Sequence, residues 1–222
     1  MANKTIETRR QRVSAIIPIL QSDYPDAKCS LDHHTPLQLL VATILSAQCT
    51  DERVNIVTRT LFKKYISAAD YAKVPQEELE KDIQSTGFYR NKARNIRAMA
   101  QALIDKHSGG VPKTMDELHD LAGVGRKTAN VVLGNAFRIN VGVTVDTHVT
   151  RLSNRLGLTK HPSDAVKIEQ DLIEIVPQKH WCEWSHWLIY HGRKVCQARK
   201  PMCSACNLLA HCPSGAKFLH VR

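Results

Sequence analysis

The stretch Leu121–Asp146 holds the residues that are best suited to chemistry. A helical pattern there carries Lys127 in its first turn, and a turn-rich segment then ends at Asp146. The positive end of a helix dipole and the neighbouring Arg126 both disfavour an ammonium, so they favour the neutral amine that a nucleophile needs. A carboxylate such as Asp146 can take up a proton or stabilise growing positive charge. From these residues alone, a surface lysine and a helix N-cap aspartate remain the alternatives.

A Gly-Val-Gly turn, residues 123–125, precedes that helical pattern. Glycine permits a positive φ and lets another backbone approach closely. The amides of such a turn and of the next helix N-terminus point outward, which suits a phosphate oxygen and reads no base. The turn therefore predicts a hairpin that grips a phosphate backbone, with an ordinary turn between two helices as the alternative.

Four cysteines near the end of the chain predict a metal site. Cys196, Cys203, Cys206 and Cys212 lie too close together in the sequence to be chance packing. Four thiolates suit zinc or an iron–sulfur cluster, and the softness of sulfur does not separate the two. The other cysteines, which we expect to pack rather than to bind a metal, are Cys29, Cys49 and Cys182.

The charge balance favours a partner with many negative charges. Lysine and arginine outnumber aspartate and glutamate by 31 to 21, which gives the 222-residue chain a formal net charge of +10. Such a surplus suits nucleic acid, because each phosphate contact releases condensed counterions. No apolar run approaches the ~20 residues that cross a bilayer, and the polar N-terminus lacks the apolar stretch of a signal peptide. We expect a cytoplasmic protein without a membrane partner, where structural disulfides are rare.

Apolar residues recur at helical spacing along most of the chain, and no convincing pair of strands appears. Besides the helix that carries Lys127 and two that begin near Thr50 and Pro75, we expect helices over residues 1–24, 37–45, 90–106, 114–121, 148–156, 164–176 and 181–191. We expect Gly192 to stop the last of these. The chain is therefore predicted to be all-α.

Two of the predicted helices carry basic side chains on a polar face. The first of them places Arg9, Arg10 and Arg12 there. The face of helix 90–106 that lies opposite its apolar stripe is either solvated or turned towards a polyanion. Its basic residues are Arg90, Lys92, Arg94 and Arg97.

Taken together, these motifs resemble the endonuclease III family of DNA glycosylases. The stretch Leu121–Ala129, followed by Val145–His148, resembles the helix-hairpin-helix signature of that family. Further motifs in family order are Leu45–Asp51, Gly87–Ala93, His191–Arg193 and the four C-terminal cysteines. The resemblance covers about residues 13–213. One departure is Ala122, where many members carry proline, which loosens the turn slightly and touches no chemical group.

The resemblance implies a role for each of these residues. The lysine and aspartate that match Lys127 and Asp146 are catalytic in the family, and members specialised for adenine or thymine mispairs lack the lysine. Gln48 and Phe88 match positions that enter the duplex, one filling the gap left by the flipped base and one wedging the opposite strand. For these two, a helix-end glutamine and a half-buried phenylalanine are the alternatives. The remaining residues that we expect to contact DNA are Leu121, Gly123, Val124, Gly125 and Arg126. The cysteine spacing matches the [4Fe-4S] loop of the family, for which we expect a structural role.

We therefore predict an all-α, two-domain helix-hairpin-helix glycosylase fold. Residues 27–138 are expected to form a six-helix barrel that ends in the hairpin. Residues 1–26 and 139–222 are expected to form a second helical domain that holds the [4Fe-4S] cluster. We expect the active site in the cleft between the two domains.

The predicted activity is that of a bifunctional DNA glycosylase and AP lyase of base excision repair. We expect a monomer that removes oxidised pyrimidines from double-stranded DNA and cuts abasic sites by β-elimination, 3′ to the lesion. In a bacterium, such a protein would associate with the nucleoid. Two alternatives remain. One is a related glycosylase for mismatched bases or pyrimidine dimers, and the other is a non-catalytic DNA-binding module with a metal staple held by the four cysteines.

Overall fold

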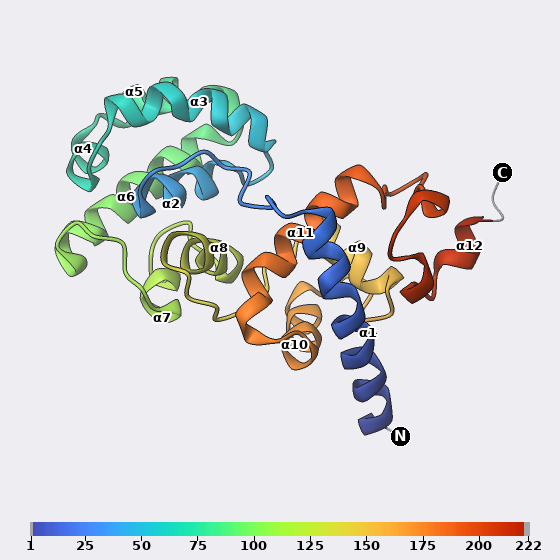
Figure 1. Ribbon diagram of the computed structural model, residues 1–222. Helices are drawn as coiled ribbons and strands as arrows, with labels where there is room; N and C mark the ends of the chain where they lie inside the picture. Colours follow the sequence, from blue (N-terminus) through green and yellow to red (C-terminus); the bar gives the residue numbers. More distant parts are fainter. Residues whose placement is uncertain (1, 220–222) are drawn as a thin grey trace. The chain divides into compact units, whose positions relative to one another are not determined.

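The computed structural model describes residues 2–219, with side chains from residue 5 onward. Over this range the chain forms α-helices, short 3-10 helices and loops, and no β-strand (Figure 1). The prediction of an all-α chain is confirmed. The chain divides into two compact units, one of Met1–Lys28 with Asn140–Arg222 and one of Cys29–Ile139.

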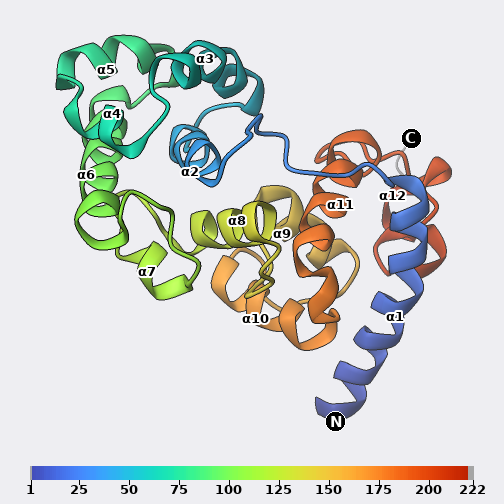
Figure 2. The same cartoon turned by 60° about the vertical axis from the view of Figure 1, so that its left-hand side comes forward.

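In the unit Cys29–Ile139, helix α2 packs against α3, α6 and α8. Helices α4 and α5 pack along α6, and α2 packs against α8 (Figures 1 and 2). Helix α7 also packs against α8, across the predicted hairpin. The elements of this unit are α2 (Pro36–Leu45), α3 (Asp51–Lys64), α4 (Ala68–Lys73), α5 (Gln76–Ile83), η1 (Gln84–Thr86), α6 (Tyr89–His107), α7 (Met115–His119) and α8 (Arg126–Phe137).

Local sequence signals explain most starts of these helices. The side chain of Thr35 caps α2 by accepting from Gln38 N–H, with Pro36 at the first helical position, and Thr50 caps α3 in the same way. The wide apolar stripe of α2 is buried, as the sequence predicts. The hydrophobic pattern does not predict helix α4, because its six residues are too few to show a helical period. Its signal is the capping box of Ser67 and Asp70.

In the described part of the other unit, residues 2–28 and 140–219, helices and short 3-10 turns surround one apolar core. Helix α9 packs against α11 and α10, and α1 packs against α10 and α11. The core includes Val13, Ile16 and Leu20 of α1 together with Trp184 and Leu188 of α11. The elements are α1 (Ala2–Asp23), α9 (Thr147–Arg155), α10 (Ala165–Ile175), η2 (Gln178–His180), α11 (Trp181–Lys194), η3 (Cys203–Ala205), η4 (Leu209–His211) and α12 (Gly215–Leu219).

Packing between helices changes two features of this unit that a local pattern does not reveal. Arg9, which is predicted on the polar side of α1, is nearly buried. Its side chain is 11% exposed and approaches Asp171 of α10 at 3.8 Å. Gly192 does not stop α11, which continues to Lys194. A Cβ at Gly192 would lie 2.7 Å from Nδ1 of His148, so this glycine lets α9 and α11 approach each other.

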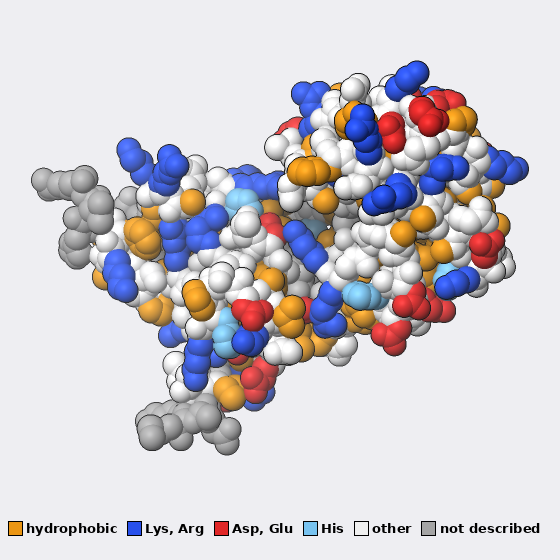
Figure 3. All heavy atoms as spheres, turned by 180° about the vertical axis from the view of Figure 1, so that it is seen from behind, with side chains coloured by type: hydrophobic (Ala, Val, Ile, Leu, Met, Phe, Trp, Pro, Cys, Tyr) orange, Lys and Arg blue, Asp and Glu red, His pale blue; other side chains and the backbone are white. Residues whose placement is uncertain are grey.

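The surface carries the basic surplus of the composition. Figure 3 shows one face of the molecule, on which lysine and arginine side chains (blue) are spread widely. No helix among the described residues is long and apolar enough to cross a membrane.

Candidate active site

The predicted hairpin lies between α7 and α8, and its two glycines serve different purposes. Gly123 has a φ of +78°, and a Cβ there would lie 3.0 Å from Cβ of Asn95, so the turn itself needs glycine. Gly125 is the N-cap of α8 in an extended conformation, and a Cβ there would meet nothing within 4 Å. No side chain caps α8 at this position. The open space above Gly125 therefore leaves the N–H groups of the first turn of α8 accessible to an anion.

The hairpin residues predicted to contact DNA differ in what they expose. The side chains of Leu121 and Val124 are buried and anchor the turn in the unit. The N–H of Val124 donates to the carbonyl of Leu121 at 3.1 Å. Arg126 is exposed at the first position of α8. A ligand could therefore meet Leu121 and Val124 through their backbone alone, but Arg126 through its side chain.

Lys127 is the second residue of α8, directly after the hairpin. Its side chain is exposed, so a bound molecule can reach the amine. Because it lies in the first helical turn, Lys127 is next to the accessible N–H groups and at the positive end of the helix dipole. The structure therefore places a reachable amine beside a site suited to an anion.

Asp146 is the N-cap of α9 in the unit that contains Asn140–Arg222. Its Oδ1 accepts a hydrogen bond of 2.8 Å from the N–H of Val149, which fixes the orientation of the carboxylate. Within residues 5–219, the other oxygen, Oδ2, accepts no further hydrogen bond. In this half-buried carboxylate, Oδ1 therefore caps α9, while Oδ2 can contact a bound molecule.

Gln48 and Phe88 share an unusual backbone conformation. Gln48 follows the C-terminus of α2 with a φ of +53°, and Phe88 precedes α6 with a φ of +47°. Residues with a Cβ avoid this left-handed region unless the surrounding structure holds them there, and such strain is common at functional sites. Both side chains are exposed, Phe88 to 63%. A large exposed aromatic on a strained turn is suited to insertion into a partner and poorly suited to packing.

The predicted basic face of α6 was wrong for one of its residues. Arg90 and Arg94 are exposed, but Lys92 is 4% exposed. Its ammonium donates to the carbonyl of Leu45 at 2.7 Å and to that of Thr86 at 2.8 Å. Burial lowers the pKa of Lys92 from its ordinary value, with a smaller opposing effect from Cys49. No pattern in the sequence predicts this burial, because both partners are backbone carbonyls. The carbonyl of Leu45 is far from Lys92 in the chain, and the carbonyl of Thr86 lies before α6 begins.

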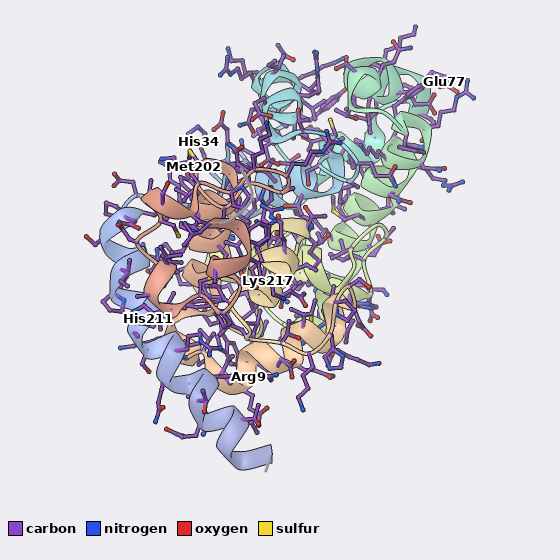
Figure 4. The ribbon with its side chains drawn as sticks, turned by 90° about the vertical axis from the view of Figure 1, so that its right-hand side faces the viewer. Arg9, His34, Glu77, Met202, His211 and Lys217 are labelled. Atoms are coloured by element: carbon purple, nitrogen blue, oxygen red, sulfur yellow. The ribbon has the colours of Figure 1, made fainter. Side chains whose placement is uncertain are left out.

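The four predicted metal ligands line one cavity at the end of the chain, with about 420 Å³ of empty space that is partly open to solvent. Figure 4 shows Met202, His211 and Lys217 on the same C-terminal segment. All seven cysteines are free thiols. Burial, and then the charge of neighbouring cysteines, raises the pKa of Cys203 and raises that of Cys206 to about 11. The side chains of residues 5–219 include no group of three His, Cys, Asp or Glu arranged to hold a metal ion.

The surroundings of these cysteines nevertheless fit a negatively charged thiolate cluster. A guanidinium N–H of Arg155 donates to Sγ of Cys196 at 3.2 Å, and Nε2 of His191 lies 3.4 Å from Sγ of Cys206. Groups of this kind stabilise sulfur ligands in iron–sulfur proteins. Four sulfurs around one cavity are also the donor set of such a cluster. The sequence does not predict Arg155 or His191 as a neighbour of the cysteine sulfurs.

Known proteins place this arrangement in a family. Residues 41–178 match the family model of HhH-GPD superfamily base excision DNA repair proteins. Endonuclease III of Synechocystis sp. is 54% identical over 95% of this chain and 96% of its own length, and that of Bacillus subtilis is 48% identical over 87% and 88%. Endonuclease III of Escherichia coli is 38% identical over 86% and 90%.

Solved structures agree. A trapped covalent intermediate of an endonuclease III with DNA, an estranged-adenine complex, has a TM-score of 0.89 and 46% identity over 95% of this chain and 99% of its own. A non-covalent endonuclease III–DNA complex gives the same score and identity over 96% and 99%. The chain therefore belongs to the HhH-GPD superfamily of base excision DNA repair proteins and, within it, to the endonuclease III family, which confirms the resemblance seen in the sequence. A thermostable thymine-DNA glycosylase, at 23% identity and a TM-score of 0.80, shares the fold.

Proposed function

We propose that this protein is a DNA glycosylase and AP lyase of base excision repair that acts on oxidised pyrimidines through a Schiff base on Lys127. The family supports the glycosylase and lyase activities. An endonuclease III with 46% identity has been trapped as a covalent intermediate with DNA. The observation that carries the assignment to one residue is the exposed amine of Lys127 in the first turn of α8, directly after the hairpin.

Lys127 performs two bond-breaking steps. Its neutral amine attacks C1′ of the damaged nucleotide, the N-glycosidic bond breaks, and the base leaves with the bonding electrons and takes up a proton. Loss of the amine proton and opening of the sugar ring give a Schiff base between Nζ and C1′. A proton then leaves C2′ to give an enamine. The enamine electrons form a C2′=C3′ double bond and restore the iminium, while the C3′–O bond breaks and the 3′ phosphate leaves with its electrons. Water finally hydrolyses the Schiff base and frees the enzyme.

Asp146 assists the first of these steps. Its second oxygen, Oδ2, accepts a proton from the attacking amine or stabilises the positive charge that grows on the sugar. Because the hydrogen bond from Val149 fixes the other oxygen, the carboxylate needs little reorganisation during the reaction. The mechanism requires Asp146 and Lys127 to act on the same deoxyribose.

The remaining residues hold the DNA. The backbone of the hairpin and the side chain of Arg126 bind phosphate, which positions the duplex without reading its sequence. Gln48 fills the gap left by the extruded nucleotide, and Phe88 wedges the opposite strand. The substrate is thus duplex DNA, which in a bacterial cell lies in the nucleoid of the cytoplasm, and one copy of the chain suffices for the reaction.

The four cysteines, Cys196, Cys203, Cys206 and Cys212, hold a [4Fe-4S] cluster. When bound, the cluster supplies a rigid crosslink for a segment that has only short helices of its own. The hydrogen bond from Arg155 reduces the negative charge on Sγ of Cys196, and the ring of His191 lies next to Sγ of Cys206. No step of base removal passes through the cluster.

Borohydride trapping on a duplex with one abasic site tests this proposal. Reduction fixes a Schiff base as a permanent crosslink, so the protein forms a crosslinked product that Lys127→Gln abolishes. The control is Lys106→Gln, which changes an exposed lysine in the last turn of α6 and leaves the crosslink intact. A crosslink that persists in Lys127→Gln refutes the assignment. No crosslink from the folded wild-type protein makes Lys127 a phosphate contact and the chain a monofunctional glycosylase or a binding module.

The preference for oxidised pyrimidines needs its own measurement. A panel of duplexes that carry an oxidised pyrimidine, a mismatched thymine or a pyrimidine dimer compares the rates of base release. Faster release of the oxidised pyrimidine supports the proposal. Faster release of either other lesion assigns the protein to that substrate and leaves the lysine mechanism unchanged.

A further inference from the structure

Lys92 occupies a position that is unfavourable for a lysine. It lies near the N-terminus of α6, where the helix dipole disfavours positive charge, and its side chain is 4% exposed. A buried ammonium needs strong hydrogen-bond partners. Both partners of Nζ are backbone carbonyls, those of Leu45 and Thr86. An apolar residue would fill the same space without this desolvation cost, so the two hydrogen bonds need an explanation.

The two carbonyls belong to the turns that carry Gln48 and Phe88. Leu45 is the last residue of α2, and Gln48 follows in the turn after it. Thr86 is the last residue of η1, and Phe88 follows after Gly87. The ammonium thus binds the chain just before each of the two left-handed residues.

Lys92 is also connected to the second turn through its own backbone. Its N–H donates to the carbonyl of Phe88 at 3.1 Å. The side chain of Thr86 is buried and donates to the carbonyl of Ile83 at 2.8 Å, which anchors that end of the turn. The carbonyl of Leu45 is one of the unpaired acceptors at the C-terminus of α2, where a cation is favoured. One side chain therefore ties the end of α2, the end of η1 and the start of α6 together.

We propose that Lys92 is a positioning residue that holds the Gln48 turn and the Phe88 turn in a fixed relation, so that both side chains enter the duplex together. The inference rests on the proposed roles of Gln48 and Phe88. Strained left-handed residues keep their conformation only where neighbouring structure fixes them, and Lys92 supplies such a fixed point to both. Without it, each turn can relax independently, and the two side chains no longer match the gap and the opposite strand.

Lys92→Met removes the ammonium and keeps an unbranched side chain of similar length. The variant is expected to lose about 10- to 100-fold in kcat/KM on a lesion within a duplex, which is the cost of misplacing a group by roughly 1 Å. An abasic site in single-stranded DNA has no opposite strand and leaves no gap in a duplex to be filled. The rate of borohydride crosslinking to this substrate is therefore expected to change by less than about twofold. Lys92→Gln, which keeps donors for the two carbonyls, is expected to recover part of the duplex activity.

Coupling to the two turns distinguishes positioning from general stability. Gln48→Ala and Phe88→Ala are combined, and Lys92→Met is then added to this double variant. A positioning residue has little left to position, so the added loss on duplex DNA shrinks to less than about twofold. If Lys92 only stabilises the fold, Lys92→Met lowers the activity by the same factor in the double variant as in the wild type. The matched control is Leu103→Ala in the buried face of α6, whose loss of activity is expected to be equal on duplex and single strand.

The outcomes separate this inference from the proposed function. If Lys92→Met lowers duplex and single-strand activity equally, or if its loss is undiminished in the Gln48→Ala/Phe88→Ala background, Lys92 is a structural residue and the inference is wrong. If Gln48→Ala and Phe88→Ala leave duplex activity unchanged, their proposed duplex-entry roles fail instead. If Lys92→Met does not fold, Lys92→Gln carries the same cycle.

Discussion

Oδ1 of Asp146 accepts a hydrogen bond of 2.8 Å from the N–H of Val149, so the proposed catalytic carboxylate also caps α9. Asparagine caps helices as well as aspartate does, but it carries no charge. Asp146→Asn is therefore expected to change the free energy of unfolding by less than about 0.5 kcal/mol and to slow base removal by about 100-fold or more. Urea unfolding and single-turnover assays measure the two effects.

Asp146→Ala is the comparison for that experiment. It loses the charge and the cap together, so it is expected to destabilise the protein by about 0.5–2 kcal/mol in addition to losing activity. If Asp146→Asn keeps full activity, the carboxylate is a cap and has no catalytic role.

Local signals made the cap and the hairpin predictable from the sequence. Asp146 directly precedes one helical pattern, and the two glycines of the hairpin lie between two further helical patterns. Lys92 and Gly192 were misassigned for the opposite reason. The partners that define them, such as the carbonyl of Leu45 and the ring of His148, come close only when distant helices pack. The helical period of α6 is the same whether Lys92 meets water or a carbonyl.

The two hairpin glycines are expected to respond differently to alanine. Gly123→Ala forces a Cβ into a φ of +78° and to within 3.0 Å of Asn95, so it is expected to cost about 1–3 kcal/mol of stability. Gly125→Ala meets nothing within 4 Å and is expected to cost less than about 1 kcal/mol. It still weakens binding to duplex DNA, because its methyl group covers the amides that bind phosphate.

Fluorescence anisotropy with a labelled abasic duplex, together with thermal unfolding, measures both variants. A Gly125→Ala protein that binds DNA as tightly as the wild type would show that the hairpin amides do not contact phosphate. An equally stable Gly123→Ala protein would show that the turn can adopt another conformation.

The cysteines divide into two groups with different expected effects. Serine at any of the four that line the C-terminal cavity is expected to lower the content of iron and acid-labile sulfide and to destabilise the protein. The matched controls are Cys29→Ser and Cys182→Ser, which leave both contents unchanged. Metal analysis of the purified protein is the measurement. Zinc in place of iron would contradict the [4Fe-4S] assignment while leaving the four cysteines as ligands.

Gly192→Ala is expected to separate α9 from α11. The added Cβ would lie 2.7 Å from Nδ1 of His148 and 2.9 Å from a guanidinium nitrogen of Arg151. Arg151 also donates to the carbonyl of Cys196, so the disturbance extends to the start of the cysteine segment. We expect a loss of about 1–3 kcal/mol in the free energy of unfolding. The control is Gly110→Ala, whose Cβ would meet only the carbonyl of His107, at 3.4 Å, and which is expected to stay within about 0.5 kcal/mol of the wild type.

His186 gives the stability of the protein a specific dependence on pH. Burial lowers its pKa to about 4, against a smaller opposing effect from Glu183. The unfolded chain therefore takes up a proton on this ring as the pH falls below about 6.5, whereas the folded protein stays neutral there until about pH 4. The stabilisation is complete above about pH 6.5 and is lost as the pH falls through this interval. Between about pH 7.5 and about pH 5 we expect a loss of about 2 kcal/mol from this residue.

Urea unfolding at these two pH values, in the wild type and in His186→Gln, isolates the contribution. Glutamine does not titrate, so the variant is expected to lose about 2 kcal/mol less than the wild type over the same interval. The other titrating groups are common to both proteins and cancel in the comparison. Equal losses in the two proteins would mean that the imidazole of His186 becomes protonated in the folded state near its ordinary pKa, and that α11 accommodates the charge.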